Sequence, residues 1–157
     1  MNKTVIIAMS GGVDSSTAAY LLKKQGFNVI GITLKLFPQG GKCCNLSDIN
    51  DARFVAGKLG IPFYILDFEK EFERNVIDYF CNEYLSGKTP NPCVICNELV
   101  KFNLLIKYAG DIGADYIATG HYAKNEYDKK YKRFVLKKGA DKKKDQSYFL
   151  YRLNQSQ

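Results

Sequence analysis

The hydrophobic positions of this chain divide it into short apolar runs separated by longer stretches with helical spacing. The short runs are rich in β-branched and aromatic residues, which favours β-strands. We expect strands at residues 4–9, 28–36, 62–68 and 115–119. Between the strands, apolar residues recur at helical spacing. We expect helices after residue 16, from residue 47 or 48 to 59, from 69 to 85, and from 93 to 109.

This alternation predicts the fold class α/β, with a doubly wound, mostly parallel sheet that carries helices on both faces. Ligands of such sheets bind beyond the carboxyl ends of the strands. The segments expected there are residues 10–16, 34–45, 68 onward and 120–122. After Tyr122 the pattern becomes a polar stretch with a short β-like run at 134–136, and residues 153–157 look like the start of a helix.

The segment between the first strand and the first helix reads Ser-Gly-Gly-Val-Asp-Ser-Ser, residues 10–16. Gly11 and Gly12 permit backbone torsions that other residues avoid, so successive amides can face one concavity. The helix that follows directs its free N–H groups and its positive dipole end to the same place. Ser10, Ser15 and Ser16 add hydroxyl donors. The expected ligand is a phosphate or pyrophosphate.

An ordinary helix N-cap, formed by Asp14 or Ser15 after a tight turn, is the alternative for this segment. The segment lacks the Gly-Lys-Ser/Thr ending of a Walker A loop and does not match GxGxxG. It resembles instead the PP-loop of ATP pyrophosphatases, enzymes that split ATP into AMP and pyrophosphate.

The charge of the chain is concentrated at its end. The 157 residues, enough for one domain with a core, carry a net charge of +7. Residues 1–123 hold 12 Lys/Arg and 12 Asp/Glu, whereas residues 124–157 hold 11 and 4. A basic end on a neutral body indicates either a polyanionic partner or a solvated, lysine-rich hairpin. No apolar run reaches membrane-spanning length and no signal peptide is recognisable, so we expect no membrane association and a cytoplasmic location.

Two of the five cysteines, Cys93 and Cys96, follow a Pro-rich loop near a helix start, where Asn91 is expected as N-cap and Pro92 as the first helical residue. Their spacing puts them on one face of that helix. Three interpretations stay open: a reactive or redox thiol pair, half of a metal or Fe–S site completed by Cys43 and Cys44, or two small residues in a core.

Two further residues, Cys81 and His121, are assigned from their positions in the predicted elements. Cys81 lies within a helical pattern and is expected in the core. His121, the sole histidine, follows the fourth strand and Gly120 at the ligand-binding edge, so a functional and a structural role are both open.

Five motifs now stand in order along the chain, and together they resemble the family of tRNA-specific 2-thiouridylases. The motifs are SGGVDSS, CCNLSDINDAR, GKTPNPCVICNELVKF, TGHYA and KDQSYFLYRL. The similarity covers essentially the whole chain. It implies an adenine-nucleotide alpha-hydrolase-like PP-loop domain that acts on the wobble uridine of tRNA.

The resemblance also implies roles for particular residues. ATP, with Mg²⁺ on its phosphates, would contact the first motif and two later positions: Ala8, Met9, Ser10, Gly11, Gly12, Val13, Asp14, Ser15, Ser16, Leu34 and Gly120. The uridine 2-carbonyl oxygen would attack the α-phosphate, and a persulfide on the nucleophile Cys96 would then deliver sulfur obtained from a sulfur-donor protein. Contacts to tRNA would come from Asn91, Pro92, Cys93, His121, Lys144, Asp145 and Gln146.

The chain departs from the family pattern in two respects. A second catalytic cysteine after the KDQ motif is absent, as are the family's central and β-barrel domains. We therefore expect residues 1–157 to be a PP-loop domain truncated at its C-terminal end. Position 93 is Asp or Cys in the family, and the Cys form, with Cys96, would allow a [4Fe-4S] cluster in place of a persulfide.

Two other function classes compete with thiolation. A different PP-loop enzyme, such as an amide-forming synthetase or a tRNA-lysidine synthetase, would share the loop but would not need the NPCVIC segment. A metal- or cluster-binding module without catalysis would use Cys43, Cys44, Cys93 and Cys96 as ligands.

Overall fold

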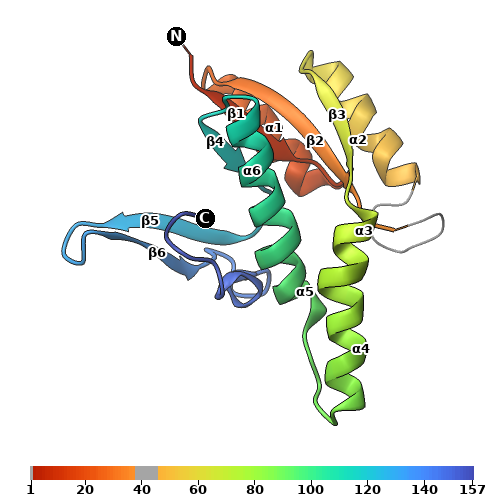
Figure 1. Cartoon of the computed structure of the whole chain (residues 1–157). Helices are drawn as coiled ribbons and strands as arrows, with labels where there is room; N and C mark the ends of the chain where they lie inside the picture. Colours follow the sequence, from red (N-terminus) through yellow and green to blue (C-terminus); the bar gives the residue numbers. More distant parts are fainter. Residues whose placement is uncertain (1, 38–45) are drawn as a thin grey trace.

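The computed structural model describes residues 2–37 and 46–157 and contains a four-stranded, fully parallel sheet (Figure 1). The strand order is β3-β2-β1-β4. The strands are β1 (Thr4–Ala8), β2 (Asn28–Lys35), β3 (Phe63–Asp67) and β4 (Tyr116–Ala118). Residue Ile7 of β1 lies between Gly31 of β2 and Ala118 of β4. The predicted strands and their parallel arrangement are confirmed.

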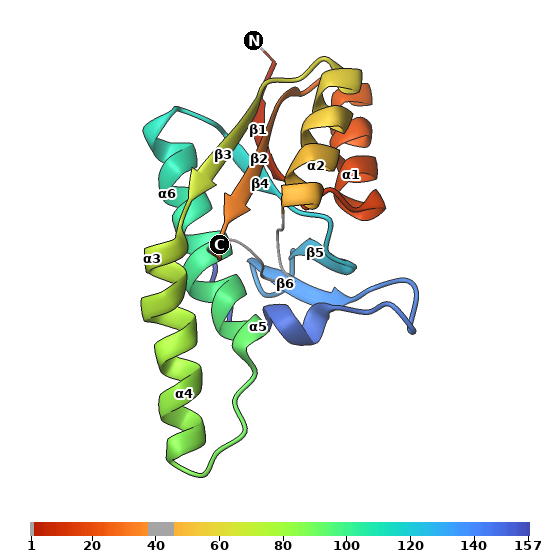
Figure 2. The same ribbon diagram turned by 90° about the vertical axis from the view of Figure 1, so that its right-hand side faces the viewer.

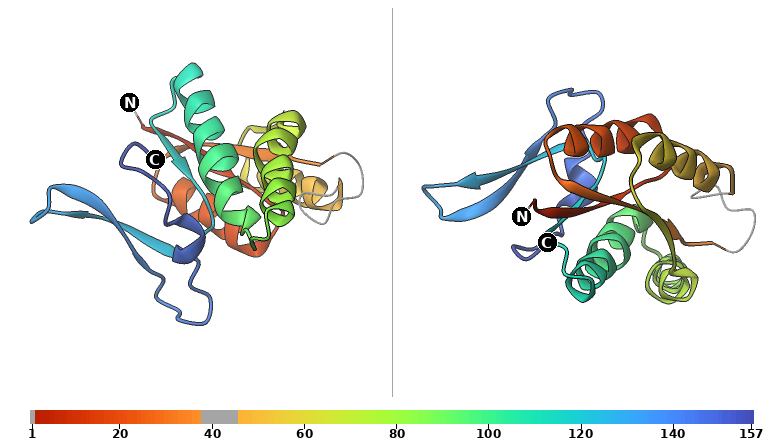
Figure 3. Two further views of the ribbon diagram at one scale, coloured as in Figure 1. Left: turned by 60° about the horizontal axis from the view of Figure 1, so that its bottom comes forward. Right: turned by 90° about the horizontal axis from the view of Figure 1, so that it is seen from above.

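Helices cover both faces of this sheet, as the view from above shows (Figure 3). On one face α1 (Val13–Lys24) and α2 (Leu46–Leu59) pack on Ile7 and Met9. On the other face the segment that ends in α6 (Asn103–Asp111) packs on Ile6 and Ile32. Because side chains alternate along a strand, the neighbours Ile6 and Ile7 enter opposite layers. The doubly wound α/β class is confirmed.

Each of the two long predicted helices contains a π-helical segment. The first consists of α3 (Glu69–Phe72), η1 (Glu73–Ile77) and α4 (Asp78–Leu85). The second consists of α5 (Pro92–Ile95), η2 (Cys96–Phe102) and α6. Each predicted helix is therefore present, but apolar periodicity did not reveal the widened turns, which occur often at functional sites.

The expectation that Cys81 lies in the core is wrong. Cys81 is exposed, and α4, which contains it, has no buried residue. Figures 1 and 2 show why: α4 extends beyond the sheet, where no second layer covers it. An amphipathic pattern predicted the helix correctly, but the length of the sheet decides how much of the helix is buried.

The basic end of the chain forms an antiparallel hairpin of β5 (Ala123–Asp128) and β6 (Arg133–Lys138), separate from the main sheet (Figure 2). Only residues 134–136 were expected as β-structure, because β5 is polar and lacks an apolar alternation. A 3₁₀ turn, η3 (Ser147–Leu150), follows. Residues 153–157 form turns, not the predicted helix, and Gln155 bonds to the backbone of Phe134. Across the described ranges no helix has the length and apolarity to span a membrane.

Candidate functional site

The loop after β1 uses the conformational freedom of glycine at one position. Gly11 has φ +78°, a conformation that L side chains rarely adopt. A Cβ atom on Gly11 would also lie 2.4 Å from the carbonyl oxygen of Asp48 in α2. Gly12 is the N-cap of α1, without a side-chain cap, so the alternative of Asp14 or Ser15 as N-cap is wrong. The loop therefore packs against α2 at a distance that only glycine allows.

Serine hydroxyls hold this loop from within. Ser15 is 5% exposed, and its Oγ accepts from the Ser10 amide at 3.2 Å and donates to the Gly12 carbonyl at 3.1 Å. Ser16 Oγ donates to the same carbonyl at 2.9 Å. We expected these hydroxyls to face a ligand, but in the structure the Ser15 and Ser16 protons are used by the loop itself.

Gly120 brings the end of β4 against this loop. A Cβ atom on Gly120 would lie 2.8 Å from the amide nitrogen of Ser15 and 3.0 Å from the carbonyl carbon of Asp14. The two segments, about a hundred residues apart in sequence, thus share one wall of a cavity.

This loop cavity has a volume of about 210 Å³ and lies beyond the carboxyl ends of β1, β2 and β4. It gathers most of the predicted nucleotide-binding residues: Ala8, Met9, Ser10, Asp14, Ser15, Leu34 and Gly120. Two residues predicted to contact tRNA, His121 and Gln146, line it as well. Gly11, Gly12, Val13 and Ser16 belong to the same loop but do not line the cavity.

Sequence reasoning missed two polar residues of the loop cavity, Lys101 and Thr119. Lys101 lies within the motif GKTPNPCVICNELVKF and Thr119 within TGHYA, so membership of these motifs was the sequence signal that could have identified them. Lys101 belongs to the π-helical η2, whose geometry the sequence pattern did not predict.

His121 is held as a neutral imidazole beside this cavity. Its Nδ1 lies 2.8 Å from Thr119 Oγ1, and its ring stacks on Phe102 with centroids 6.2 Å apart. Burial, and then the positive charge of Lys101, lower the pKa of His121 to about 4. At neutral pH the ring is therefore uncharged and contacts partners by hydrogen bonding or stacking.

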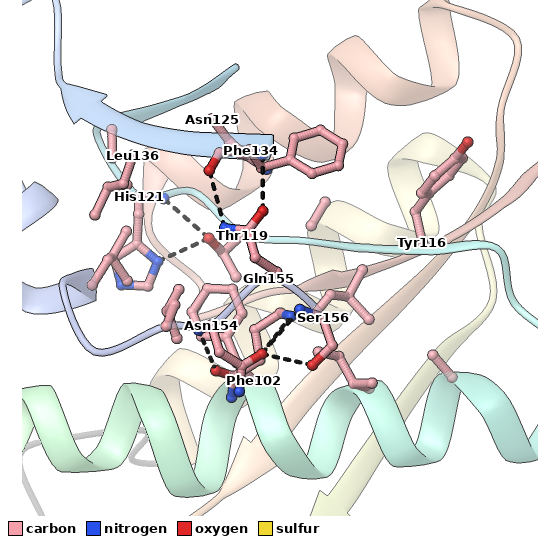
Figure 4. A pocket seen from close by; sticks show the side chains of 18 of the residues that line it. Phe102, Tyr116, Thr119, His121, Asn125, Phe134, Leu136, Asn154, Gln155 and Ser156 are labelled. Atoms are coloured by element: carbon pink, nitrogen blue, oxygen red, sulfur yellow. Dashed lines mark hydrogen bonds between the residues drawn. The ribbon is translucent and has the colours of Figure 1, made fainter. Parts of the chain in front are cut away.

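The same histidine also lines a second, larger cavity of about 700 Å³ between α6, β4, the hairpin and the last residues of the chain. Figure 4 shows His121 with Phe102 from the long helix, Phe134 and Leu136 from β6, and the amides of residues 154 and 155. This hairpin cavity combines apolar side chains with the amides of residues 154 and 155 and with the charged residues Asp115 and Lys124.

Tyr122 connects the loop cavity to residues 139–146. Its hydroxyl donates to Asp14 Oδ1 at 2.6 Å, which raises the pKa of the Tyr122 phenol. The Lys144 ammonium lies 5.3 Å from the centre of its ring. Gln146 forms two bonds with the Tyr122 backbone, each 2.9 Å long. The segment carrying the KDQ motif is thus attached to the glycine-rich loop through one residue.

Asp145 has an internal role in that segment. Its carboxylate accepts hydrogen bonds from the amide of Gly139 at 2.8 Å and from the amide and hydroxyl of Ser147 at 3.2 and 2.9 Å. These bonds, led by the one from Gly139, hold the pKa of Asp145 below its usual value.

The cysteine segment begins as predicted. Asn91 is the N-cap, its side chain accepts from the Cys93 amide at 3.1 Å, and Pro92 is the first helical residue. The two cysteines differ in environment, however: Cys93 is exposed and Cys96 is buried. Cys96 belongs to the core cluster that contains Leu34 and Leu36, both of which line the loop cavity.

A metal centre at these cysteines lacks ligands in the part of the chain that the structure describes. There, no group of three or more His, Cys, Asp and Glu side chains is arranged to hold a metal ion. Cys43 and Cys44, which would complete such a site in the metal interpretation, lie outside the described residues. The pair Cys93 and Cys96 alone does not fit a [4Fe-4S] cluster, which needs four thiolates or their substitutes.

Comparison with known proteins gives consistent matches over the whole chain. The profile of a family described as the tRNA methyl transferase HUP domain matches residues 3–157. The tRNA-specific 2-thiouridylase MnmA of Clostridioides difficile (strain 630) is 58% identical and that of Clostridium acetobutylicum 55% identical, each across 100% of this chain. The alignments cover 45% and 46% of those relatives, so the chain spans about half their length.

Among solved structures, the U34-tRNA thiolase NcsA from Methanococcus maripaludis with its [4Fe-4S] cluster has a TM-score of 0.56 at 24% identity. That match covers 76% of this chain and 39% of NcsA. A glutamine-dependent NAD+ synthetase from Acinetobacter baumannii, in complex with ADP, has a TM-score of 0.52 at 17% identity, covering 76% and 22%. At these identities the likeness shows a shared fold.

Proposed function

Because this chain belongs to the tRNA methyl transferase HUP domain family, we propose that it is the ATP-using part of a tRNA-uridine 2-sulfurtransferase. One observation carries the proposal: the loop cavity collects Ser10, Asp14 and Ser15 with Leu34 and Gly120 at the carboxyl ends of three parallel strands. The high sequence identity to tRNA-specific 2-thiouridylases supports the choice of tRNA thiolation as the proposed reaction. We place this activity in the cytoplasm.

ATP is the proposed substrate of the loop cavity. Asp14 and Ser15, in the first turn of α1, line this cavity, so the positive end of the helix dipole favours a pyrophosphate group there. Asp14 lines the cavity and offers a carboxylate for Mg²⁺ on the phosphates. Leu34 and Leu36 supply apolar contacts for the nucleoside.

The proposed chemistry activates an unreactive carbonyl. The uridine 2-oxygen attacks the α-phosphate, the bond to the β-phosphate breaks, and pyrophosphate leaves. The terminal sulfur of a persulfide on Cys96 then attacks the uridine C2, and AMP leaves with the former 2-oxygen. Cleavage of the remaining S–S bond requires a second thiol, which becomes disulfide-bonded to Cys96. A thiol reductant would return the disulfide to two thiols, and a sulfur-donor protein would then transfer the outer sulfur of its own persulfide to Cys96.

Burial of Cys96 fits a nucleophile that reacts only with a base brought to it. A uridine in a helix or stacked loop must leave the stack before an enzyme can reach its C2 atom. The neutral His121 ring, beside the loop cavity, offers a hydrogen-bonding and stacking surface for such a base. Cys93, Asn91 and Pro92, at the start of the same helix as Cys96, are the proposed flanking contacts.

The first experiment measures nucleotide binding. ATP with Mg²⁺ should raise the melting temperature of the chain, and Asp14→Asn should reduce that shift. Asp51→Asn, an exposed carboxylate on α2 outside the cavity, is the matched control and should keep it. If millimolar ATP leaves the melting temperature of the folded wild-type chain unchanged, the proposal of a nucleotide site in the loop cavity is wrong.

The second experiment measures the reaction. With [α-³²P]ATP and tRNA, label should pass to the RNA as an AMP adduct. If this chain binds ATP but transfers no label to tRNA, while a full-length 2-thiouridylase does so in a parallel assay, the chain does not carry out the adenylation step.

The third experiment tests the proposed tRNA surface. The basic end, which holds 11 Lys/Arg and 4 Asp/Glu, should bind RNA with an affinity that falls steeply with salt. Replacing the lysines at 142–144 by Ala should reduce the slope of log K against log salt by up to about two. An unchanged slope would show that these lysines do not contact phosphates.

A further inference from the structure

Lys101 supplies a positive charge to the loop cavity. Of the described residues that line this cavity, it is the sole Lys or Arg. The ammonium is close enough to His121 for its charge to act on the imidazole. Lys101 therefore lies near His121 at the loop cavity.

No anion compensates this charge in the part of the chain that the structure describes. None of the ion pairs there includes Lys101. Asp14, the one carboxylate lining the cavity, accepts the hydroxyl of Tyr122. An anionic ligand in the cavity would form a charge-assisted contact with this ammonium group.

The π-helical segment gives Lys101 its place. In an α-helix, residues five apart lie about 140° apart around the axis, so Cys96 and Lys101 would face different directions. In the π-helical η2 the backbone bonds join residues five apart, which brings such residues close to one side of the helix. The widened turn therefore brings Cys96 and Lys101 closer to one side of the helix than an α-helical turn would.

We propose that Lys101 is a catalytic residue of the adenylation step and that its ammonium group contacts the α-phosphate of bound ATP. This inference rests on the proposed function. The amides of the loop hold the pyrophosphate end, and the uridine enters on the His121 side, so the phosphate between them is the α-phosphate. As the uridine oxygen bonds to phosphorus and pyrophosphate leaves with its electron pair, the ammonium group of Lys101 balances the charge on the equatorial oxygens.

Binding of AMP and adenosine tests the contact without any turnover. Lys101→Met should weaken AMP binding by about 10- to 100-fold and leave adenosine binding unchanged, because only AMP carries the phosphate. Lys101→Arg keeps the charge and should retain most of the AMP affinity. Lys107→Met on α6, exposed and outside both cavities, is the matched control and should bind both ligands like the wild type.

Transfer of label from [α-³²P]ATP to tRNA tests the catalytic role. Lys101→Met should slow the transfer by about 10²- to 10³-fold, the usual cost of losing one transition-state contact. Equal AMP affinity, or equal transfer, in wild type and a folded Lys101→Met chain would overturn the inference. Failure of the wild type to bind ATP at all would instead overturn the proposed nucleotide site, so the two failures are distinguishable.

Discussion

Gly120→Ala tests whether the loop cavity depends on close contact between two backbone segments. The new Cβ would lie 2.8 Å from Ser15 N and 3.0 Å from both Asp14 C and Ser15 Cα. All three atoms are backbone, so no side-chain rotation relieves the overlap, and the segments must separate by roughly 0.5 Å to regain ordinary contact distances.

Overpacking of this kind costs about 1–3 kcal/mol. For a chain of this size that corresponds to a fall in melting temperature of about 2–12 °C. The same displacement moves one wall of the loop cavity, which Gly120 and Ser15 both line. The stabilisation of Gly120→Ala by ATP with Mg²⁺ should therefore be smaller than that of the wild type.

Scanning fluorimetry with and without ATP measures both effects. Gly57→Ala is the matched control, because Gly57 is an exposed residue of α2 with no atom within 4 Å of its added Cβ. It should raise stability by about 0.5–1 kcal/mol, the usual gain for Gly→Ala in a helix. A Gly120→Ala chain that melts like the wild type, with the same shift on ATP, would refute the packing argument.

Three further predictions concern single side chains. Because the pKa of His121 is about 4 in the folded chain and about 6.5 in an unfolded one, the unfolded state takes up the proton first. Stability should therefore fall between pH 6.5 and 4, by at most about 3 kcal/mol, and His121→Gln should remove this loss in urea unfolding at several pH values. Tyr122→Phe removes the donor to Asp14 and should lower the melting temperature of the chain; an unchanged melting temperature would show that the contact is unimportant. Iodoacetamide should modify the exposed Cys93 before the buried Cys96 in the native chain, as peptide mass spectrometry can measure, and the reverse order would contradict the burial.

Local pattern was enough to determine the main architecture. The apolar runs predicted the four parallel strands, and helical spacing predicted the helices on both faces, because each pattern follows from the geometry of its own element. The glycine-rich segment was predicted in its position between the first strand and the first helix. Of its two glycines, Gly11 has a positive φ, which few other residues tolerate, whereas Gly12 is extended. Asn91 and Pro92 likewise predicted the helix start that they form.

What the sequence did not determine depends on contacts between distant segments. The burial of Cys96 and exposure of Cys81 follow from where the sheet ends beneath each helix. The polar strand β5 forms because β6 pairs with it, not because of its own composition. Lys101 reaches the loop cavity through a π-helical turn, and Tyr122 reaches Asp14 across 108 residues of chain. Periodicity describes one element at a time, so only the folded chain decides which side chains meet in the cavity.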